Sequence, residues 1–388
     1  AASSWVAAQL TQHPILLDEL LDPRSLYDPL DKAGLRGVLD VRLAGIPADD
    51  LEQQMDRLRQ FQQASVLQVA AADIVTQLPL PRVADHLTYI AETVLERVLQ
   101  QAWEQLAARH GKPGYLRHGK LCEAHFGIVA YGKLGGYELG YGSDLDIVFL
   151  HDSTGNDQHT AGPKVLGNSE FFTRLSQRII HYLNTYTAAG VLYEVDMRLR
   201  PNGASGLLVS SLDAFAEYQR TSAWTWENQA LVRARVVAGS EEIVRQFERI
   251  RSGVLARPRD AVKLRKEVRE MRQRMRDELD KTNARQVDLK QCRGGIVDIE
   301  FMVQCGVLLW SDEHPELLAH TDNLRLLDAF ATAGLVSADE AAQLVDAYCT
   351  IRHHINHLAL QEQPSVAGHD VLLQQREAVA EIWGRFMG

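Results

Sequence analysis

The chain has 388 residues and a formal net charge of −10, with 46% hydrophobic and 24% charged residues. These values are typical of a globular protein with more than one core, and the acidic balance disfavours a general nucleic-acid-binding protein. No run of about 18 uncharged apolar residues occurs, so we expect no membrane span. The four cysteines show no CxxC pair, which fits a cytoplasmic protein, and the first residues lack both a methionine and a signal-peptide stretch, which indicates a fragment.

Apolar residues recur at helical spacing through residues 1–115. The spacing predicts a helix over residues 49–77, with two acids at its start, and a second helix over about 82–110. A Gly-Lys-Pro-Gly run then interrupts the pattern. We therefore expect an all-helical region at the N-terminal end of this chain.

The pattern changes between residues 116 and 245. Continuous apolar runs predict strands at 125–130 and 144–150, and strict alternation predicts a third strand over 192–199. A helical pattern fills about 168–188. From 246 to 388 the pattern is helical again. The sequence thus predicts an α+β protein in which a small mixed-sheet domain lies between two all-helical regions.

The second predicted strand carries two acids at alternate positions. Asp144 and Asp146 face one way, and Leu145 and Ile147 face the other way into a core. Residues two apart in a strand are roughly 6–7 Å apart along the backbone, which suits two divalent cations between their carboxylates. The simpler interpretation is a solvated face of an antiparallel sheet.

The third predicted strand has an apolar face and a polar face that mixes acids with arginines. Its polar positions include Asp196 and Arg198. Asp196 would complete a three-carboxylate cluster with Asp144 and Asp146. Arg198 would then be placed to meet a phosphate with its planar guanidinium.

The loop before Asp144 has the residue types that a phosphate site needs. Its glycines, among them Gly135 and Gly136, allow close backbone approach, Lys133 adds positive charge and Ser143 offers a hydroxyl. The spacing matches neither a P-loop nor a dinucleotide fingerprint. Hairpin turns alone would also explain the glycines, but their position just before the DxD pair favours a site.

Together the glycine turn, the DxD strand and the later acid resemble the nucleotidyltransferase superfamily that includes DNA polymerase β. The run YGKLGGYELGYGSDLD at 131–146 resembles more closely the adenylyltransferase half of glutamine synthetase adenylyltransferase, and so do the stretches YEVDMRLRPN at 193–202, WTWENQA at 224–230 and RGGIVDIEFMVQ at 293–304. The resemblance is strongest over residues 116–310. It implies a palm-like domain over 116–245, flanked by helical regions at 1–115 and 246–388.

The resemblance implies transfer of AMP from ATP to a tyrosine hydroxyl of glutamine synthetase, with PII signal protein and glutamine as regulators. Two Mg²⁺ ions would be held by Asp144, Asp146 and Asp196, and Asp196 is also a candidate proton acceptor. Ser143 and the Gly135 and Gly136 amides would fix the phosphates. No protein nucleophile is needed, because the partner supplies the attacking hydroxyl.

Three further features keep two interpretations each. Lys290, before a Gly-Gly-Ile run and Asp298, is a candidate phosphate contact, but structural glycines with a helix-start acid explain the segment equally well. Residues 257–276 hold nine basic and three acidic residues, which indicates either a solvated helix face or a patch that steers an anion. Trp224 and Trp226 suit a core or stacking on a base.

Two other functions remain open. The chain could be the phosphorolytic, AMP-removing half of the same bifunctional enzyme, or a nucleotide-binding regulatory module without catalysis. The intact acids at 144, 146 and 196 argue against the second.

Overall fold

The computed structural model describes residues 3–20, 28–117 and 119–388. Parts of the predicted N-terminal helical region, residues 1–2 and 21–27, lie outside the described residues. The chain divides into two compact units. The sheet unit comprises residues 8–222 and 234–250, and the bundle unit comprises 1–7, 223–233 and 251–388.

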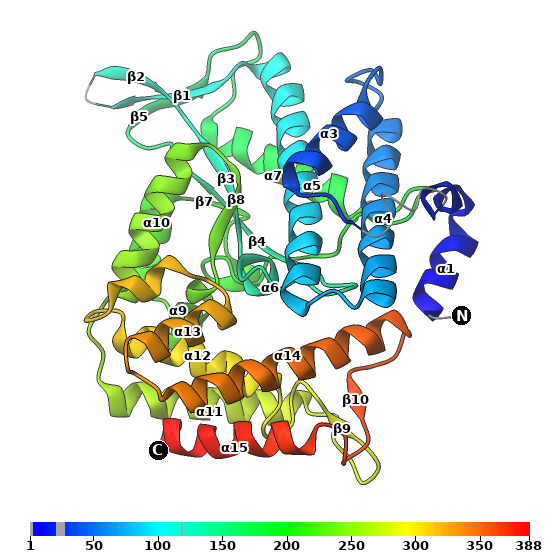
Figure 1. Ribbon diagram of the computed structural model, residues 1–388. Helices are drawn as coiled ribbons and strands as arrows, with labels where there is room; N and C mark the ends of the chain where they lie inside the picture. The colour runs from blue at the N-terminus through cyan, green and yellow to red at the C-terminus, as the bar shows by residue number, and fades with distance from the viewer. Residues whose placement is uncertain (1–2, 21–27, 118) are drawn as a thin grey trace. The chain divides into compact units, whose positions relative to one another are not determined.

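Helices form the first part of the sheet unit. The short helices are α1 (Ser4–Gln12), which begins in the other unit, η1 (Pro14–Leu20) and α3 (Lys32–Leu43). The long helices α4 (Leu51–Thr76) and α5 (Leu80–His110) lie side by side (Figure 1). The apolar spacing of the sequence predicted both as helices. Asp50 caps α4, because its side chain accepts a bond from the Gln53 amide.

A five-stranded sheet follows, and it is the core of this unit. β3 (Phe126–Ala130) pairs antiparallel with both β4 (Leu145–His151) and β8 (Arg235–Gly239). β6 (Val195–Asp196) and β7 (Val209–Ser211) both pair parallel with β4. The β3 residues are all buried, since helices cover the sheet. A separate three-stranded sheet, drawn at the upper left of Figure 1, is made of β1 (Pro113–Arg117), β2 (Lys120–Glu123) and β5 (Asn156–Thr160).

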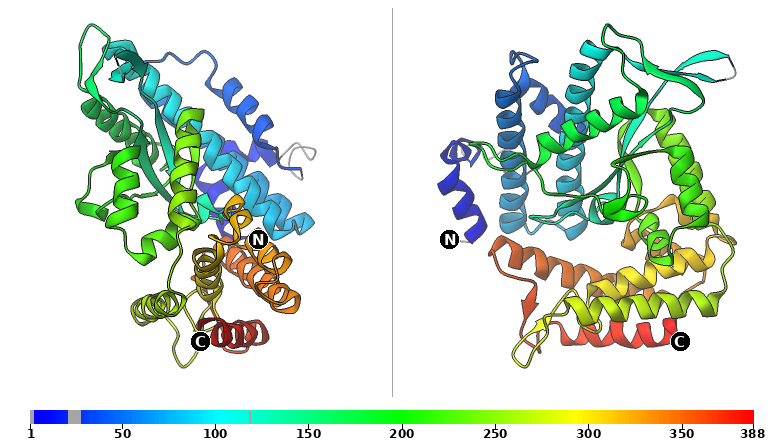
Figure 2. Two further views of the ribbon diagram at one scale, coloured as in Figure 1. Left: turned by 90° about the vertical axis from the view of Figure 1, so that its left-hand side faces the viewer. Right: turned by 180° about the vertical axis from the view of Figure 1, so that it is seen from behind.

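The remaining helices of this unit are α6 (Gly132–Gly135), α7 (Asn168–Asn184), α8 (Leu212–Thr221) and the first part of α10 (Glu241–Leu255), with a 3-10 turn, η2 (Gly203–Ser205). The α7 helix crosses α5, as the view from behind shows (Figure 2). It ends four residues earlier than the predicted 188. The reason is Arg59, whose buried guanidinium donates to the Tyr182 and Thr185 carbonyls and so completes the helix end.

The third predicted strand is much shorter than expected. Only Val195 and Asp196 pair with β4, and a turn begins at Arg198. The Asp196 carboxylate accepts the Arg198 backbone N–H at 2.8 Å, which folds the chain into an Asx turn. Alternation beyond Asp196 was therefore not a strand signal.

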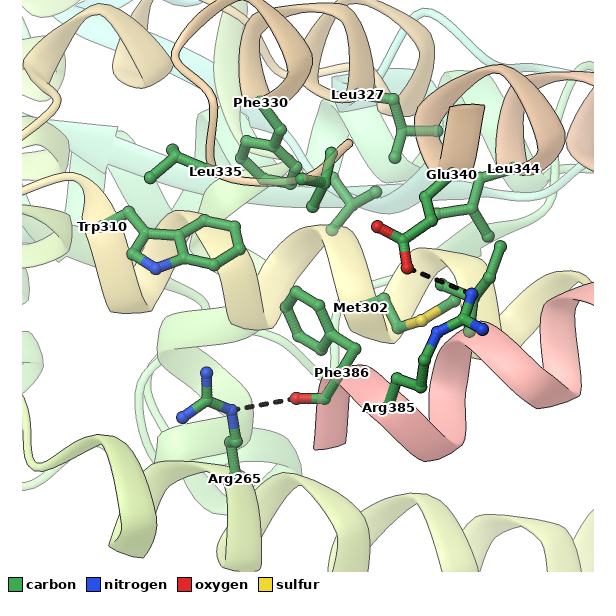
Figure 3. Close-up of a pocket in the computed structure, with 13 residues that line it drawn as sticks. Arg265, Met302, Trp310, Leu327, Phe330, Leu335, Glu340, Leu344, Arg385 and Phe386 are labelled. Carbon is green, nitrogen blue, oxygen red and sulfur yellow. Dashed lines mark hydrogen bonds and ion pairs between the residues drawn. The ribbon is translucent and has the colours of Figure 1, made fainter. Parts of the chain in front are cut away.

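The bundle unit is built around α12 (Ile296–Trp310), whose residues are almost all buried. Around it lie the other helices, α9 (Thr225–Val232), α11 (Ala261–Leu279), α13 (Asn323–Thr332), α14 (Ala338–Leu360) and α15 (Leu373–Met387), with η3 (Pro315–Ala319) and a two-stranded ribbon of β9 (Val287–Asp288) and β10 (Val366–Ala367). An apolar pocket of about 240 Å³ opens between these helices, with Trp310, Phe330 and Phe386 in its wall and the Arg385–Glu340 ion pair beside it (Figure 3).

Trp224 and Trp226 do not belong to a core. Their side chains are 70% and 37% exposed, so the core interpretation was wrong for both. Within the described residues, no helix is both long and apolar enough to cross a bilayer.

Candidate metal and nucleotide centre

Asp146 and Asp196 lie directly opposite each other on neighbouring strands. In the parallel pairing of β4 with β6, Leu145 is the partner of Val195 and Asp146 is the partner of Asp196. Asp144 stands just before β4. One carboxylate oxygen from each of Asp144, Asp146 and Asp196 lies within 4.8 Å of the others. The predicted convergence of the three acids is thus confirmed, while the roles assigned to them stay predictions.

The alternation of β4 explains why two of these acids face outward. Leu145 and Ile147 are fully buried, so Asp146 between them and Asp144 just before them point to the other face. Asp144 is exposed, and Asp146 and Asp196 are half-buried. Three carboxylates held so close together are a set of hard oxygen donors, and such donors suit Mg²⁺.

Arg198 is the cation that stands next to this acidic cluster. Its guanidinium Nε lies 2.8 Å from Asp196 Oδ2, and its Nη2 also pairs with that oxygen. These hydrogen bonds hold the pKa of the Asp196 carboxyl below its usual range. An acid that stays ionised in this way suits a metal ligand better than the predicted proton acceptor. The Arg198 side chain is 82% exposed, so it is free to move toward an incoming anion.

The glycine turn touches the acidic cluster at Gly132. This residue begins the one-turn helix α6 with a φ of +54°, and a Cβ placed on it would come within 2.3 Å of Asp146 Oδ2. The neighbouring Tyr131 amide donates to the Asp146 backbone oxygen at 2.9 Å. Only glycine satisfies both the backbone angle and the close approach. The hydrogen bond and the close approach therefore hold the start of α6 against β4.

The Gly135 and Gly136 amides are already used within this turn. They donate to the Tyr131 and Gly132 carbonyls at 2.9 and 3.0 Å. In this structure both amides are therefore paired within a helical turn. Their contact with phosphate stays a prediction.

Ser143 closes the loop that leads into the acidic cluster. Its Oγ accepts the Gly140 amide at 3.1 Å, and its own amide donates to the Gly140 carbonyl at 3.2 Å. The hydroxyl hydrogen is not used in either bond. Lys133 lies half-buried on α6. Contacts of both residues with phosphate stay predictions.

Family comparisons agree with this geometry. Residues 1–250 match the family model GlnE, described as glutamate-ammonia ligase adenylyltransferase. The chain belongs to the glutamate-ammonia ligase adenylyltransferase family. Beyond that match, residues 262–386 match a second model, described as GlnD PII-uridylyltransferase.

Relatives in this adenylyltransferase family align with nearly the whole length of the chain. A protein of Thioalkalivibrio sulfidiphilus is 57% identical over 386 residues, one of Nitrosococcus oceani 51% over 387, and one of Pseudomonas syringae pv. tomato 52% over 397. All three are named bifunctional glutamine synthetase adenylyltransferase/adenylyl-removing enzyme. Each match covers 99–100% of this chain and 40% of the relative, so the chain spans about two fifths of their length.

Lys290 belongs to the bundle unit and not to the sheet unit that holds the acidic cluster. Hydrogen bonds inside the bundle unit hold the segment around it. Asp298, fully buried in the first turn of α12, accepts bonds from the Gly294 amide and the Arg272 guanidinium. These contacts favour the structural interpretation of the Gly-Gly-Ile run. The contact of Lys290 with a nucleotide stays a prediction.

The basic stretch 257–276 is only partly a solvated face. Arg272 is fully buried, and both it and Arg276 pair with Asp298. Arg265 and Arg269 donate to the last carbonyls of α15, where the negative end of the helix dipole lies. Much of the local positive charge is therefore paired with carboxylate or carbonyl oxygens inside the bundle unit.

Two residues that support the centre escaped prediction. The Tyr141 hydroxyl, in the loop before Asp144, donates to Asp73 of α4 at 2.9 Å, and both side chains are buried. Arg235 of β8 donates to the Gly135 and Leu134 carbonyls at the end of α6. Each contact spans more than 65 residues of sequence, and no local pattern reports such a contact.

Proposed function

We propose that this chain transfers AMP from ATP to a tyrosine hydroxyl of glutamine synthetase and releases pyrophosphate. The observation that carries the proposal is the three-carboxylate cluster beside a glycine turn, with its ligand oxygens within 4.8 Å of one another. The substrate is inferred from the relatives, which are named as glutamine synthetase adenylyltransferases. A polar surface alone has no need of three adjacent like charges, which repel one another.

The residues present fit a divalent metal. Asp144, Asp146 and Asp196 would hold two Mg²⁺ ions through hard oxygen donors, and Asp196 is kept ionised by Arg198. When bound, the metal would offset the charge of the triphosphate and favour ionisation of the attacking hydroxyl.

In the transfer itself, the tyrosine oxygen of the partner attacks the α-phosphorus of ATP. The bond between that phosphorus and the oxygen bridging to the β-phosphorus breaks, pyrophosphate leaves, and the phenolic proton passes to solvent. Arg198 would turn from Asp196 toward the triphosphate, and Lys133 and the Ser143 hydroxyl would bind the leaving phosphates. The chain's task is to orient these groups, since it contributes no covalent intermediate.

The proposal includes two further features, the architecture of the domain and the regulation of the transfer. The sheet of β3, β4, β6 and β8 would serve as a palm-like nucleotidyltransferase platform, with domain limits near 116 and 245. PII signal protein and glutamine would regulate the transfer and so link it to nitrogen supply. Adding either should change the rate of AMP transfer without changing its chemistry.

Removal of AMP is the second candidate, because the relatives' names include an adenylyl-removing activity. In that reaction inorganic phosphate would attack the phosphorus of the tyrosine-bound AMP and yield ADP. The same acids and the same arginine would serve it. The two activities differ in the direction in which label moves.

The decisive experiment incubates the chain with Mg²⁺, glutamine synthetase and ATP labelled either at the α- or at the γ-phosphate. We expect α-label on the partner, and γ-label in the released pyrophosphate but not on the partner. If label instead leaves pre-modified glutamine synthetase only when phosphate is added, the chain is the removing half. Asp144→Asn with Asp146→Asn should abolish either activity and leave the circular dichroism spectrum unchanged. Unchanged activity in that variant would refute the metal assignment.

A further inference from the structure

Arg235 holds the far side of the glycine turn. It stands on β8 opposite Ala130 of β3, and its side chain is 12% exposed. Its Nε donates to the Gly135 carbonyl at 3.0 Å and its Nη2 to the Leu134 carbonyl at 3.0 Å. These are carbonyls at the C-terminal end of α6, where helical carbonyls are satisfied by groups outside the helix; the Leu134 carbonyl also accepts the Tyr137 amide at 3.4 Å. One guanidinium thus closes the turn.

The opposite end of the same turn lies close to the acidic cluster. Gly132, the first residue of α6, has no room for a Cβ because Asp146 Oδ2 would lie 2.3 Å from it. The Gly132 backbone therefore forms one wall of the space that the Asp146 carboxylate occupies, and a shift of α6 changes that space.

Tyr137 shows that the turn is held under strain. Its φ of +54° is uncommon for a non-glycine residue and costs on the order of 1 kcal/mol. The Arg235 guanidinium lies over its ring, 3.6 Å from the centroid. Stacking of this kind offsets such a cost. The contact ties the chain after α6 to the same arginine.

An ion pair with a buried acid of α5 also holds Arg235. Glu92 of α5 is 3% exposed and forms an ion pair with the Arg235 guanidinium. Lys32 of α3 pairs with the same carboxylate. The arginine therefore connects a buried helix to the turn that touches Asp146, and all these residues lie in the sheet unit.

We propose that Arg235 is a positioning residue of the transfer site. Its two hydrogen bonds, its stacking on Tyr137 and its ion pair with Glu92 hold α6 in place. Because Gly132 begins α6 beside Asp146, the position of α6 determines the space available to the Asp146 carboxylate. The inference rests on the proposed function for its kinetic part. Its structural part concerns the geometry of the three carboxylates, which metal binding reports without any turnover.

The test compares Arg235→Met with Arg59→Met in the full chain. Arg59 is a control of the same residue type in the sheet unit: it is fully buried, whereas the Arg235 side chain is 12% exposed, and it too donates to backbone carbonyls. These carbonyls belong to Met55 of α4, to the end of α7 and to Gly190. Mn²⁺ affinity is measured by electron paramagnetic resonance, and kcat and KM for ATP are measured by transfer of α-label. Both are expressed per folded molecule.

We expect Arg235→Met to weaken Mn²⁺ binding and to lower kcat, each about 10-fold or more, with a smaller change in KM. Arg59→Met should lower the unfolding midpoint while leaving both values within about twofold. Arg235→Lys keeps the charge beside Glu92 but has one nitrogen in place of the planar Nε and Nη2 pair that holds the two carbonyls, so it should recover only part of the loss. It also carries the comparison if the methionine variant does not fold.

Equal losses in the Arg59 and Arg235 variants, or wild-type Mn²⁺ affinity and kcat in both Arg235 variants, would overturn the inference. Failure of the proposed function looks different. In that case the wild-type chain transfers no AMP, yet Mn²⁺ binding still weakens on loss of Arg235. A chain that binds no Mn²⁺ at all would overturn both.

Discussion

Gly132 is the glycine whose replacement bears most directly on the acidic cluster. Alanine there meets two penalties, a positive φ and a contact of 2.3 Å with the Asp146 carboxylate oxygen. Gly142 offers a matched control, because its φ is +67° but a Cβ added to it would meet no atom within 4 Å. The pair separates backbone strain from pressure on the acidic cluster.

We predict that Gly132→Ala and Gly142→Ala each lose about 1 kcal/mol of stability through backbone strain. Only Gly132→Ala should also reduce AMP transfer, by about 100-fold, since it displaces Asp146. Urea unfolding and the α-label assay measure the two effects. Equal activity in the two variants would show that Asp146 has room to adjust.

His151 makes the stability of the sheet unit depend on pH. Its ring stacks on Phe172 with 4.6 Å between centroids, its Nδ1 accepts the Ser153 amide, and burial lowers its pKa to about 4. Between pH 6.5 and 4 the unfolded chain therefore binds a proton that the folded chain does not. Stability is present above this window and falls as pH decreases through it.

We predict that the free energy of unfolding falls by about 2 kcal/mol from this residue alone between pH 7 and pH 5. His151→Phe keeps the stacking and removes the titration, so its unfolding free energy should change less with pH over that range. Denaturant titrations at both pH values measure the difference. A variant with the wild-type pH slope would place the sensitivity elsewhere.

Residues also show where sequence analysis succeeds and fails. The acids at 144 and 146 were predictable because strand alternation is local, and Asp196 because it lies within a second polar pattern. Arg235, Tyr141 and Asp73 were not, since their contacts join distant elements. The pairing of the Gly135 and Gly136 amides within α6 was also not predictable, because a glycine-rich run does not reveal whether its N–H groups are used in a helical turn.

At the scale of elements, the long helices were the easiest to predict, the strand that contains β6 was predicted too long, and β1, β2, β5, β7 and β8 were not predicted. α4 and α5 have many turns over which apolar spacing repeats, so each turn adds to the signal. The third strand has only two paired residues, and the polar bonds of Asp196 and Arg198 end it. Short alternating segments report which residues share a face but not where pairing stops.

The α11 helix shows that charge composition does not fix exposure. Arg272 and Asp298 form a fully buried ion pair between α11 and α12. We predict that Arg272→Met costs about 3–5 kcal/mol, because it removes one partner of a buried charge, and that Arg272→Met with Asp298→Asn costs less than the sum of the two single changes.

Hydrogen exchange of the α11 and α12 amides measures this cost within the bundle unit. Lys266→Met is the control, since Lys266 lies on the same helix with its side chain 67% exposed. A loss in the control equal to that of Arg272→Met would mean that helix charge, rather than the buried pair, stabilises the unit.

At the scale of the whole molecule, the acidic cluster, its glycine turn and Arg235 all belong to one compact unit. We therefore predict that Arg272→Met, which weakens the bundle unit, leaves Mn²⁺ affinity within about twofold of wild type, as expected for separate sites. The measurement is a metal titration at a temperature where the variant is folded. A large loss of affinity would mean that the bundle unit contributes to the centre.

The most direct measurement is a titration of the chain with Mn²⁺ in the presence of ATP, followed by electron paramagnetic resonance, for wild type, Asp146→Asn and Asp213→Asn. Asp213 is an exposed acid in the first turn of α8 in the same unit, so it controls for loss of one negative charge. We predict two bound Mn²⁺ ions per chain in wild type and in Asp213→Asn, and a loss of at least about 10-fold in affinity in Asp146→Asn. Equal binding by all three proteins would contradict the assignment of the three carboxylates as a metal and nucleotide centre.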